Sequence, residues 1–124
     1  MKAELAVVAL AGMLASGGAM ADTQYDGNEL LRQCQQYIKL IDSEKNYNLV
    51  DAGFCGGFVQ GVHGTVAFLS DDLVKEAKFC SPNGVTNNQL VRIVVKFLKD
   101  NPKQLNLNRT GLVWAAFQDA YPCK

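Results

Sequence analysis

The sequence GFCGGFVQGVHG occupies residues Gly53–Gly64, inside an uncharged stretch that extends from Ala52 to Leu69. At a helical advance of about 100° per residue, four of its five glycines fall on one side and most of its larger apolar side chains on another. A helix that is apolar nearly all round is typical of a buried position. We therefore predict a central helix with one face in the hydrophobic core. The residues expected on that face are Phe54, Cys55, Phe58, Val59, Val62, Thr65, Val66 and Leu69.

The glycine side of this helix consists of Gly53, Gly57, Gly61 and Gly64. A glycine costs about 1 kcal/mol relative to alanine within a helix, but it lets a second backbone approach closely. The main interpretation is that this side packs against another helix of the same chain. The alternative is that the glycines form an interface with a second copy of the chain or with another partner.

The N-terminal segment is typical of a secretory signal peptide. Met1–Lys2 is a short basic opening, Leu5–Ala15 is apolar and uncharged, and Ala19–Ala21 is an A-x-A cleavage signal. The apolar run is shorter than the about 20 residues that a bilayer span requires. We therefore predict a signal peptide at residues 1–21 and a single exported domain at residues 22–124 that does not cross a membrane; the alternative is an uncleaved N-terminal anchor.

The charges are balanced, with 12 basic and 12 acidic residues and a formal net charge of zero. Zero net charge provides no electrostatic attraction to nucleic acid or to an anionic membrane surface. The sequence also contains no phosphate-binding loop, EF-hand or nucleophile-elbow motif. We therefore expect a binding protein that is not an enzyme and that uses neither a cofactor nor a metal.

The single histidine, His63, lies eight residues after Cys55 on the predicted helix, which is about 12 Å along its axis. This separation excludes a thiolate–imidazole pair and favours a structural or interface histidine. Trp114 and Gln118 fall off the apolar stripe of the last predicted helix. These two residues indicate either a contact surface or a second buried side.

Helical spacing and capping residues predict three more helices. Asp26 followed by Glu29, and Thr86 followed by Gln89, are both capping-box patterns that mark helix starts. A short helical turn is expected within residues 73–77. The fold class is therefore all-α, a small four-helix domain with short turns between the helices. The four helices are expected near residues 27–41, 49–69, 87–100 and 108–120.

The four cysteines all lie in the predicted exported domain. An even number without any C-x-x-C pair indicates two disulfides rather than a metal site, and three pairings are possible. Helices joined by a short loop run antiparallel, and Cys34 and Cys55 each lie about 10 Å from the loop between their helices. Cys80 and Cys123 lie at the open end of the second helical hairpin. We therefore predict the bridges Cys34–Cys55 and Cys80–Cys123.

An ordered set of motifs resembles the Rap/Tai family of type VI secretion immunity proteins over nearly the whole exported part. The motifs are Gly27-x-x-Leu30-x-x-x-Cys34, Cys55-Gly56-Gly57-Phe58-x-x-Gly61, Cys80-x-Pro82-x-x-Val85, Gln89-Leu90-x-x-x-Val94-x-x-Phe97-Leu98 and Leu112-Val113-x-x-Ala116-Phe117-x-x-Ala120-x-Pro122-Cys123. The resemblance implies a periplasmic helical protein, commonly a homodimer. Such a protein binds a peptidoglycan amidase effector and blocks its active-site cleft.

The inhibitory surface is expected in the loops at residues 70–79 and 80–86, because they are the most irregular segments of the domain. The alternative function is that of a periplasmic helical chaperone that holds unfolded proteins under acid stress. The residues predicted to bind the effector are Ser70, Asp71, Asp72, Lys75, Ser81 and Asn83.

Overall fold

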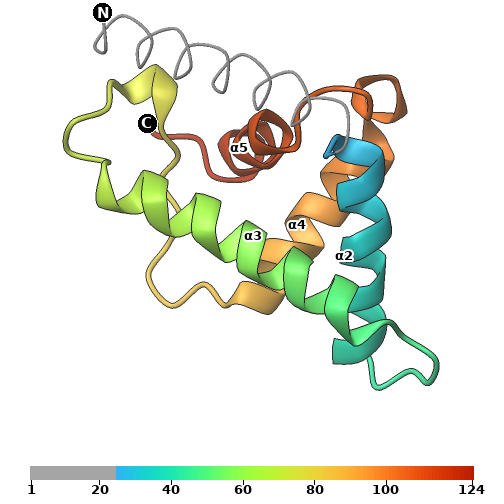
Figure 1. The fold of residues 1–124 in the computed structure, drawn as a ribbon. Coiled ribbons are helices and arrows are strands. Elements are labelled where there is room, and N and C mark those ends of the chain that lie inside the picture. The colour runs from blue at the N-terminus through green and yellow to red at the C-terminus, as the bar shows by residue number, and fades with distance from the viewer. Residues whose placement is uncertain (1–24) are drawn as a thin grey trace, which may run out of the picture.

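A computed structural model describes residues 25–124, so the predicted signal peptide at residues 1–21 lies outside the described part. The described part confirms the all-α fold, and each helix begins and ends within one residue of its predicted bounds (Figure 1). The elements are α2 (Gly27–Ile41), α3 (Leu49–Phe68), α4 (Asn87–Asp100) and α5 (Arg109–Ala120), with short 3-10 turns η1 (Lys75–Ala77) and η2 (Pro102–Gln104).

Side-chain caps explain where the helices begin. Thr86 and Gln89 form the full reciprocal capping box at the start of α4, as predicted. At the start of α2, Asp26 accepts a hydrogen bond from the backbone N–H of Glu29. The second half of that predicted capping box does not form, because both carboxylate oxygens of Glu29 accept hydrogen bonds from Arg32 instead. At the N-terminus of α2, only the Asp26 half of the capping box therefore forms.

An antiparallel hairpin of α2 and α3 is closed by the Cys34–Cys55 disulfide, whose Cα atoms are 5.0 Å apart. We call this bridge the core disulfide, because both cysteines are fully buried. Next to it, a Cβ atom at Gly56 would lie 2.7 Å from the ring of Tyr37 on α2. Gly56 is therefore the glycine that allows α2 and α3 to pack closely, although it was not part of the predicted glycine side.

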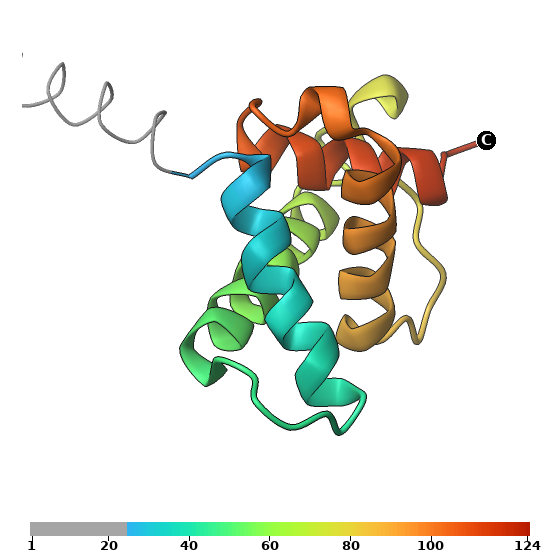
Figure 2. The same ribbon diagram turned by 90° about the vertical axis from the view of Figure 1, so that its right-hand side faces the viewer.

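The remaining helices complete a single core. α4 lies beside α2 and contacts α3, and α5 crosses over the ends of α2 and α4 (Figure 2). A single β-bridge between Asp26 and Asn108 ties the start of α2 to the start of α5. The largest fully buried side chains include Leu30, Val59, Val91, Val94, Leu98, Val113 and Phe117.

Only one side of α3 is buried, which corrects the prediction of a helix buried nearly all round. Ala52, Cys55, Gly56, Val59 and Val66 face the core. The prediction failed because an uncharged helix contains no polar side that would mark the direction of solvent. Among the residues expected in the core, Phe54 is 60% exposed, and Thr65 and Leu69 are also exposed.

The glycine side of α3 does not pack against another helix of the described chain. A Cβ atom built at Gly53, Gly57, Gly61 or Gly64 would meet no atom within 4 Å. The main interpretation of these glycines is therefore wrong for residues 25–124. Contact with a second copy or another partner stays a prediction.

Candidate functional site

The residues predicted to bind a partner lie in the segment that connects α3 to α4, which we call the α3–α4 loop (residues 69–86). Of the six predicted residues, Asp71, Asp72, Lys75 and Asn83 are exposed. Ser70 and Ser81 are half-buried and take part in the internal contacts of the loop. The structure therefore places four of the six side chains where a partner could reach them.

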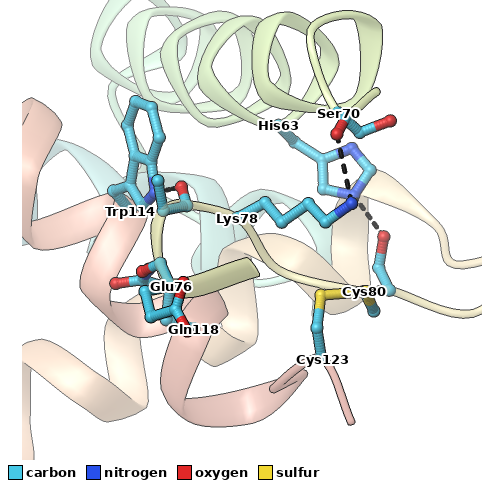
Figure 3. The surroundings of a disulfide bond; sticks show 10 residues. His63, Ser70, Glu76, Lys78, Cys80, Trp114, Gln118 and Cys123 are labelled. Carbon is cyan, nitrogen blue, oxygen red and sulfur yellow. Dashed lines mark hydrogen bonds between the residues drawn. A yellow bond between two sulfur atoms is a disulfide. The ribbon is translucent and has the colours of Figure 1, made fainter. Parts of the chain in front are cut away.

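Helix α5 braces the middle of this loop. The indole N–H of Trp114 donates to the carbonyl of Ala77 at 2.8 Å, and the side-chain amide of Gln118 donates to the carbonyl of Glu76 at 2.9 Å (Figure 3). These bonds satisfy carbonyls of the η1 turn, which would otherwise rely on water. The two side chains that fell off the apolar stripe of α5 thus hold η1 against that helix.

The second predicted bridge, Cys80–Cys123, is also confirmed, with a Cα–Cα distance of 5.0 Å. We call it the loop disulfide. The backbone N–H of Cys80 donates to the carbonyl of Tyr121 at 2.8 Å, beside the bridge. Lys78 Nζ donates to the carbonyl of Ser70 at 3.1 Å and so closes the first half of the loop on itself (Figure 3).

His63 ties the second half of the loop to α3. Its Nε2 atom lies 2.8 Å from the Ser81 hydroxyl. The imidazole stacks on Phe79 at a centroid distance of 5.5 Å and meets Phe117 edge-on at 5.6 Å. Burial lowers the pKa of His63 below its ordinary value. This environment matches the prediction of a structural histidine, because both rings and the hydroxyl hold the side chain in one place.

Two exposed apolar side chains at the loop were missed by the sequence analysis. Phe68, the last residue of α3, is 86% exposed, and Val74, just before η1, is 67% exposed. Large apolar side chains exposed beside polar ones are common at protein-binding surfaces. The available signal was the apolar pair Leu73–Val74 within an otherwise charged loop, but sequence alone does not show which member faces solvent.

Within residues 25–124, no group of three or more histidine, cysteine or acidic side chains could hold a metal ion. In the same range, no helix is long and apolar enough to cross a membrane. What the structure does present is an exposed loop fixed by a disulfide, by α5 and by His63. These features define a small, disulfide-stapled helical domain suited to binding another protein.

Comparison with known proteins identifies the family. The family model described as Rap1a immunity proteins matches residues 26–123, and the chain belongs to this family. The match confirms the resemblance found in the cysteine and apolar motifs, and it assigns an immunity role that implies a partner effector protein. No curated protein and no solved structure matched the chain.

Proposed function

We propose that this immunity protein acts in the periplasm, where it inhibits a peptidoglycan amidase effector delivered by a type VI secretion system. In this proposal the protein acts by binding alone and the α3–α4 loop obstructs the active-site cleft of the effector. Family membership over residues 26–123 is the observation that carries the proposal. The geometry of the loop supports the choice of the inhibitory surface.

A preformed loop suits inhibition, because a partner then binds it without paying the entropy of ordering it. The α3–α4 loop is held at η1, at Cys80 and at Ser81, while residues before η1 and after Ser81 remain exposed. Val74 offers an apolar anchor, and Asp71 and Asp72 lie near it in the chain as polar neighbours. An apolar centre with a polar rim is the usual composition of a protein interface.

Export and pairing are part of the same proposal. Residues 1–21 are proposed to direct the chain out of the cytoplasm, and the two disulfides suit an oxidising compartment. We further propose that the protein is a homodimer, as the resemblance implies.

The test is inhibition of the purified product of the adjacent reading frame in a peptidoglycan-cleavage assay. Val74→Asp and Asp72→Lys change exposed loop residues, so they should raise the inhibition constant at least tenfold without changing the thermal melt. Asp119→Lys is a matched control, because Asp119 is an exposed acid on α5. Unchanged inhibition by both loop variants would contradict the choice of the loop. Failure of the unmodified protein to bind the effector in a pull-down would contradict the proposed target.

The chaperone alternative has one observation in its favour, the exposed Phe54 and Phe68 on α3. A chaperone active under acid stress should expose more apolar surface at pH 3 than at pH 7 and should suppress aggregation of an unfolded client. Binding of a hydrophobic dye at the two pH values distinguishes the functions. An immunity protein of the proposed kind should show no such rise while it remains folded.

A further inference from the structure

The turn at Asn83 and Gly84, in the second half of the α3–α4 loop, has a chemically reactive sequence. Asparagine is among the thermolabile residues of proteins. Its side-chain amide can react with the next backbone nitrogen, and a following glycine has no side chain to block that approach. Asn83 is the only asparagine in the sequence that a glycine follows directly. The sequence therefore marks Asn83 as the most reactive asparagine of the chain.

The structure leaves the two reacting groups accessible. Asn83 and Gly84 are both exposed, and a Cβ atom at Gly84 would meet no atom within 4 Å. Within residues 25–124, neither the Gly84 N–H nor the Asn83 side-chain amide forms a hydrogen bond, and the nearest side-chain bonds along the chain are at Ser81 and Thr86. No internal bond therefore has to break before the Gly84 nitrogen can reach the Asn83 side chain.

The start of α2 provides a contrast within the same chain. Asp26 is also followed by a glycine, and aspartate can close the same ring with the nitrogen of a following residue. However, the Gly27 N–H donates to the carbonyl of Leu107 at 3.2 Å, and Gly27 is buried. The Asp26 carboxylate in turn accepts a hydrogen bond from the backbone N–H of Glu29. The fold thus holds one of the two similar sequences in place and leaves the other open.

We propose that Asn83 is a site of spontaneous deamidation in the folded protein. The Gly84 nitrogen attacks Cγ of Asn83, so a new nitrogen–carbon bond closes a cyclic imide. The bond between Cγ and Nδ2 breaks, and the side-chain nitrogen leaves as ammonia with the proton from the Gly84 nitrogen. Water then opens the imide at either of its carbonyls, which gives aspartate or isoaspartate. The net reaction consumes water, releases ammonia and transfers no electrons.

Deamidation changes the charge of the α3–α4 loop. Asparagine is neutral, whereas aspartate has a pKa of about 3.9 and is ionised at neutral pH. Residues 69–86 contain three acidic and two basic side chains, so the net charge of the loop changes from −1 to −2. A modification that adds charge acts through the contacts that surround it. Here the new carboxylate appears at an exposed position that is predicted to face the effector.

The isoaspartate product also changes the shape of the loop. Its main chain runs through Cβ and the former side-chain carbonyl, which adds a methylene group to the backbone. The segment is fixed at both ends, because Ser81 lies 2.8 Å from His63 and Thr86 forms the capping box of α4. It runs outside the helices to the start of α4 (Figure 2). A longer main chain between two fixed points must bulge outward.

The consequence for inhibition rests on the proposed function of the loop. A preformed surface binds well only while its shape and charge match those of the partner. An added carboxylate or an outward bulge at Asn83 disturbs this match. The deamidated protein should therefore inhibit the effector less strongly than the newly made protein, and the inhibitory capacity of a molecule should decline with its age.

Peptide mapping by mass spectrometry tests the chemistry on the folded, disulfide-intact protein. An acidic species should accumulate on anion exchange, should map to Asn83, and should form faster at pH 9 than at pH 7, because the deprotonated nitrogen is the nucleophile. Asn83→Gln should abolish it, since glutamine would have to close a larger and less favourable ring. Asn106→Gln is the matched control, because Asn106 is an exposed turn asparagine that leucine follows. Absence of the acidic species in the unmodified protein, or its persistence in Asn83→Gln, would overturn the proposal.

The reduced, denatured chain provides the reference rate. Deamidation of Asn83 in the folded protein should be within tenfold of this reference, because the turn leaves both groups free. Conversion of the Asp26–Gly27 pair to isoaspartate should be much slower in the folded protein than in the denatured chain. A folded-state rate at Asn83 more than a hundredfold below the reference would overturn the proposal, since it would show that the turn protects the amide.

Inhibition assays test the consequence separately. Asn83→Asp, which reproduces one product, should raise the inhibition constant at least threefold, whereas Asn106→Asp adds the same charge outside the loop and should not. Equal inhibition by the two variants would overturn the loss of inhibition but not the chemistry at Asn83. An unmodified protein that fails to bind the effector would contradict the proposed function instead. The mass measurement needs no effector, so it still decides whether Asn83 is modified.

Discussion

The open glycines of α3 lead to a quantitative prediction about stability. A Cβ atom at Gly57 or Gly61 would meet no atom within 4 Å, so alanine fits at both positions without displacing a neighbour. Glycine within a helix is less stable than alanine by about 0.5–1 kcal/mol. The double variant Gly57→Ala, Gly61→Ala should therefore raise the free energy of unfolding of the monomer by about 1–2 kcal/mol. For a domain of this size, each 1 kcal/mol raises Tm by about 4–8 °C.

The assay is urea unfolding combined with thermal melts, at a protein concentration where sedimentation shows only the monomer. Gly56→Ala is the matched control, because it makes the same change in the same helix but places the Cβ atom 2.7 Å from the Tyr37 ring. The control should lose stability while the double variant gains it. A less stable double variant under monomeric conditions would refute the reasoning, since it would mean that part of the chain covers these glycines.

Three further predictions concern the loop and its braces. Burial lowers the pKa of His63, so at acidic pH the unfolded chain binds more protons than the folded chain. The free energy of unfolding should therefore fall as the pH drops below about 6.5. His63→Gln should flatten this trend in a pH series of urea unfolding. The loop disulfide is partly exposed and the core disulfide is buried, so limiting dithiothreitol should reduce the loop disulfide first. Alkylation of the freed thiols and peptide mapping would show the order of reduction. Reduction of the core disulfide first would contradict this prediction. Trp114→Phe removes the hydrogen bond to Ala77, so it should lower the free energy of unfolding by about 1 kcal/mol. The variant should also be cleaved faster by trypsin after Lys75 or Lys78. An unchanged cleavage rate would contradict the proposed role of Trp114 in holding η1.

The helices and the disulfides could be predicted from the sequence because local signals determine them. The T-x-x-Q pattern fixes the start of α4 through bonds between residues three apart. The core disulfide follows from helix rise and a short loop, which place Cys34 and Cys55 at the same height. Both arguments require only that neighbouring segments fold in the usual way.

The orientation of α3 and the bracing of the loop could not be predicted, because they depend on distant segments. An uncharged helix gives no indication of which apolar side faces solvent, and the core here takes small residues such as Ala52 and Gly56 while Phe54 stays outside. The bond from Trp114 to Ala77 joins residues 37 positions apart, and neither residue alone suggests the contact. Glycine spacing likewise indicated a contact surface without revealing that the other residues of the described range 25–124 leave it open.

The two bridges join each cysteine to the next one along the chain, first with second and third with fourth. A polypeptide that emerges N-terminus first into an oxidising compartment presents its thiols in this same order. The first bridge can then close before the third cysteine has arrived, and no competing thiol remains when the second bridge forms. Oxidation during the proposed export should therefore give the native connectivity without help from a disulfide isomerase, whereas refolding of the fully reduced chain would expose it to all three pairings.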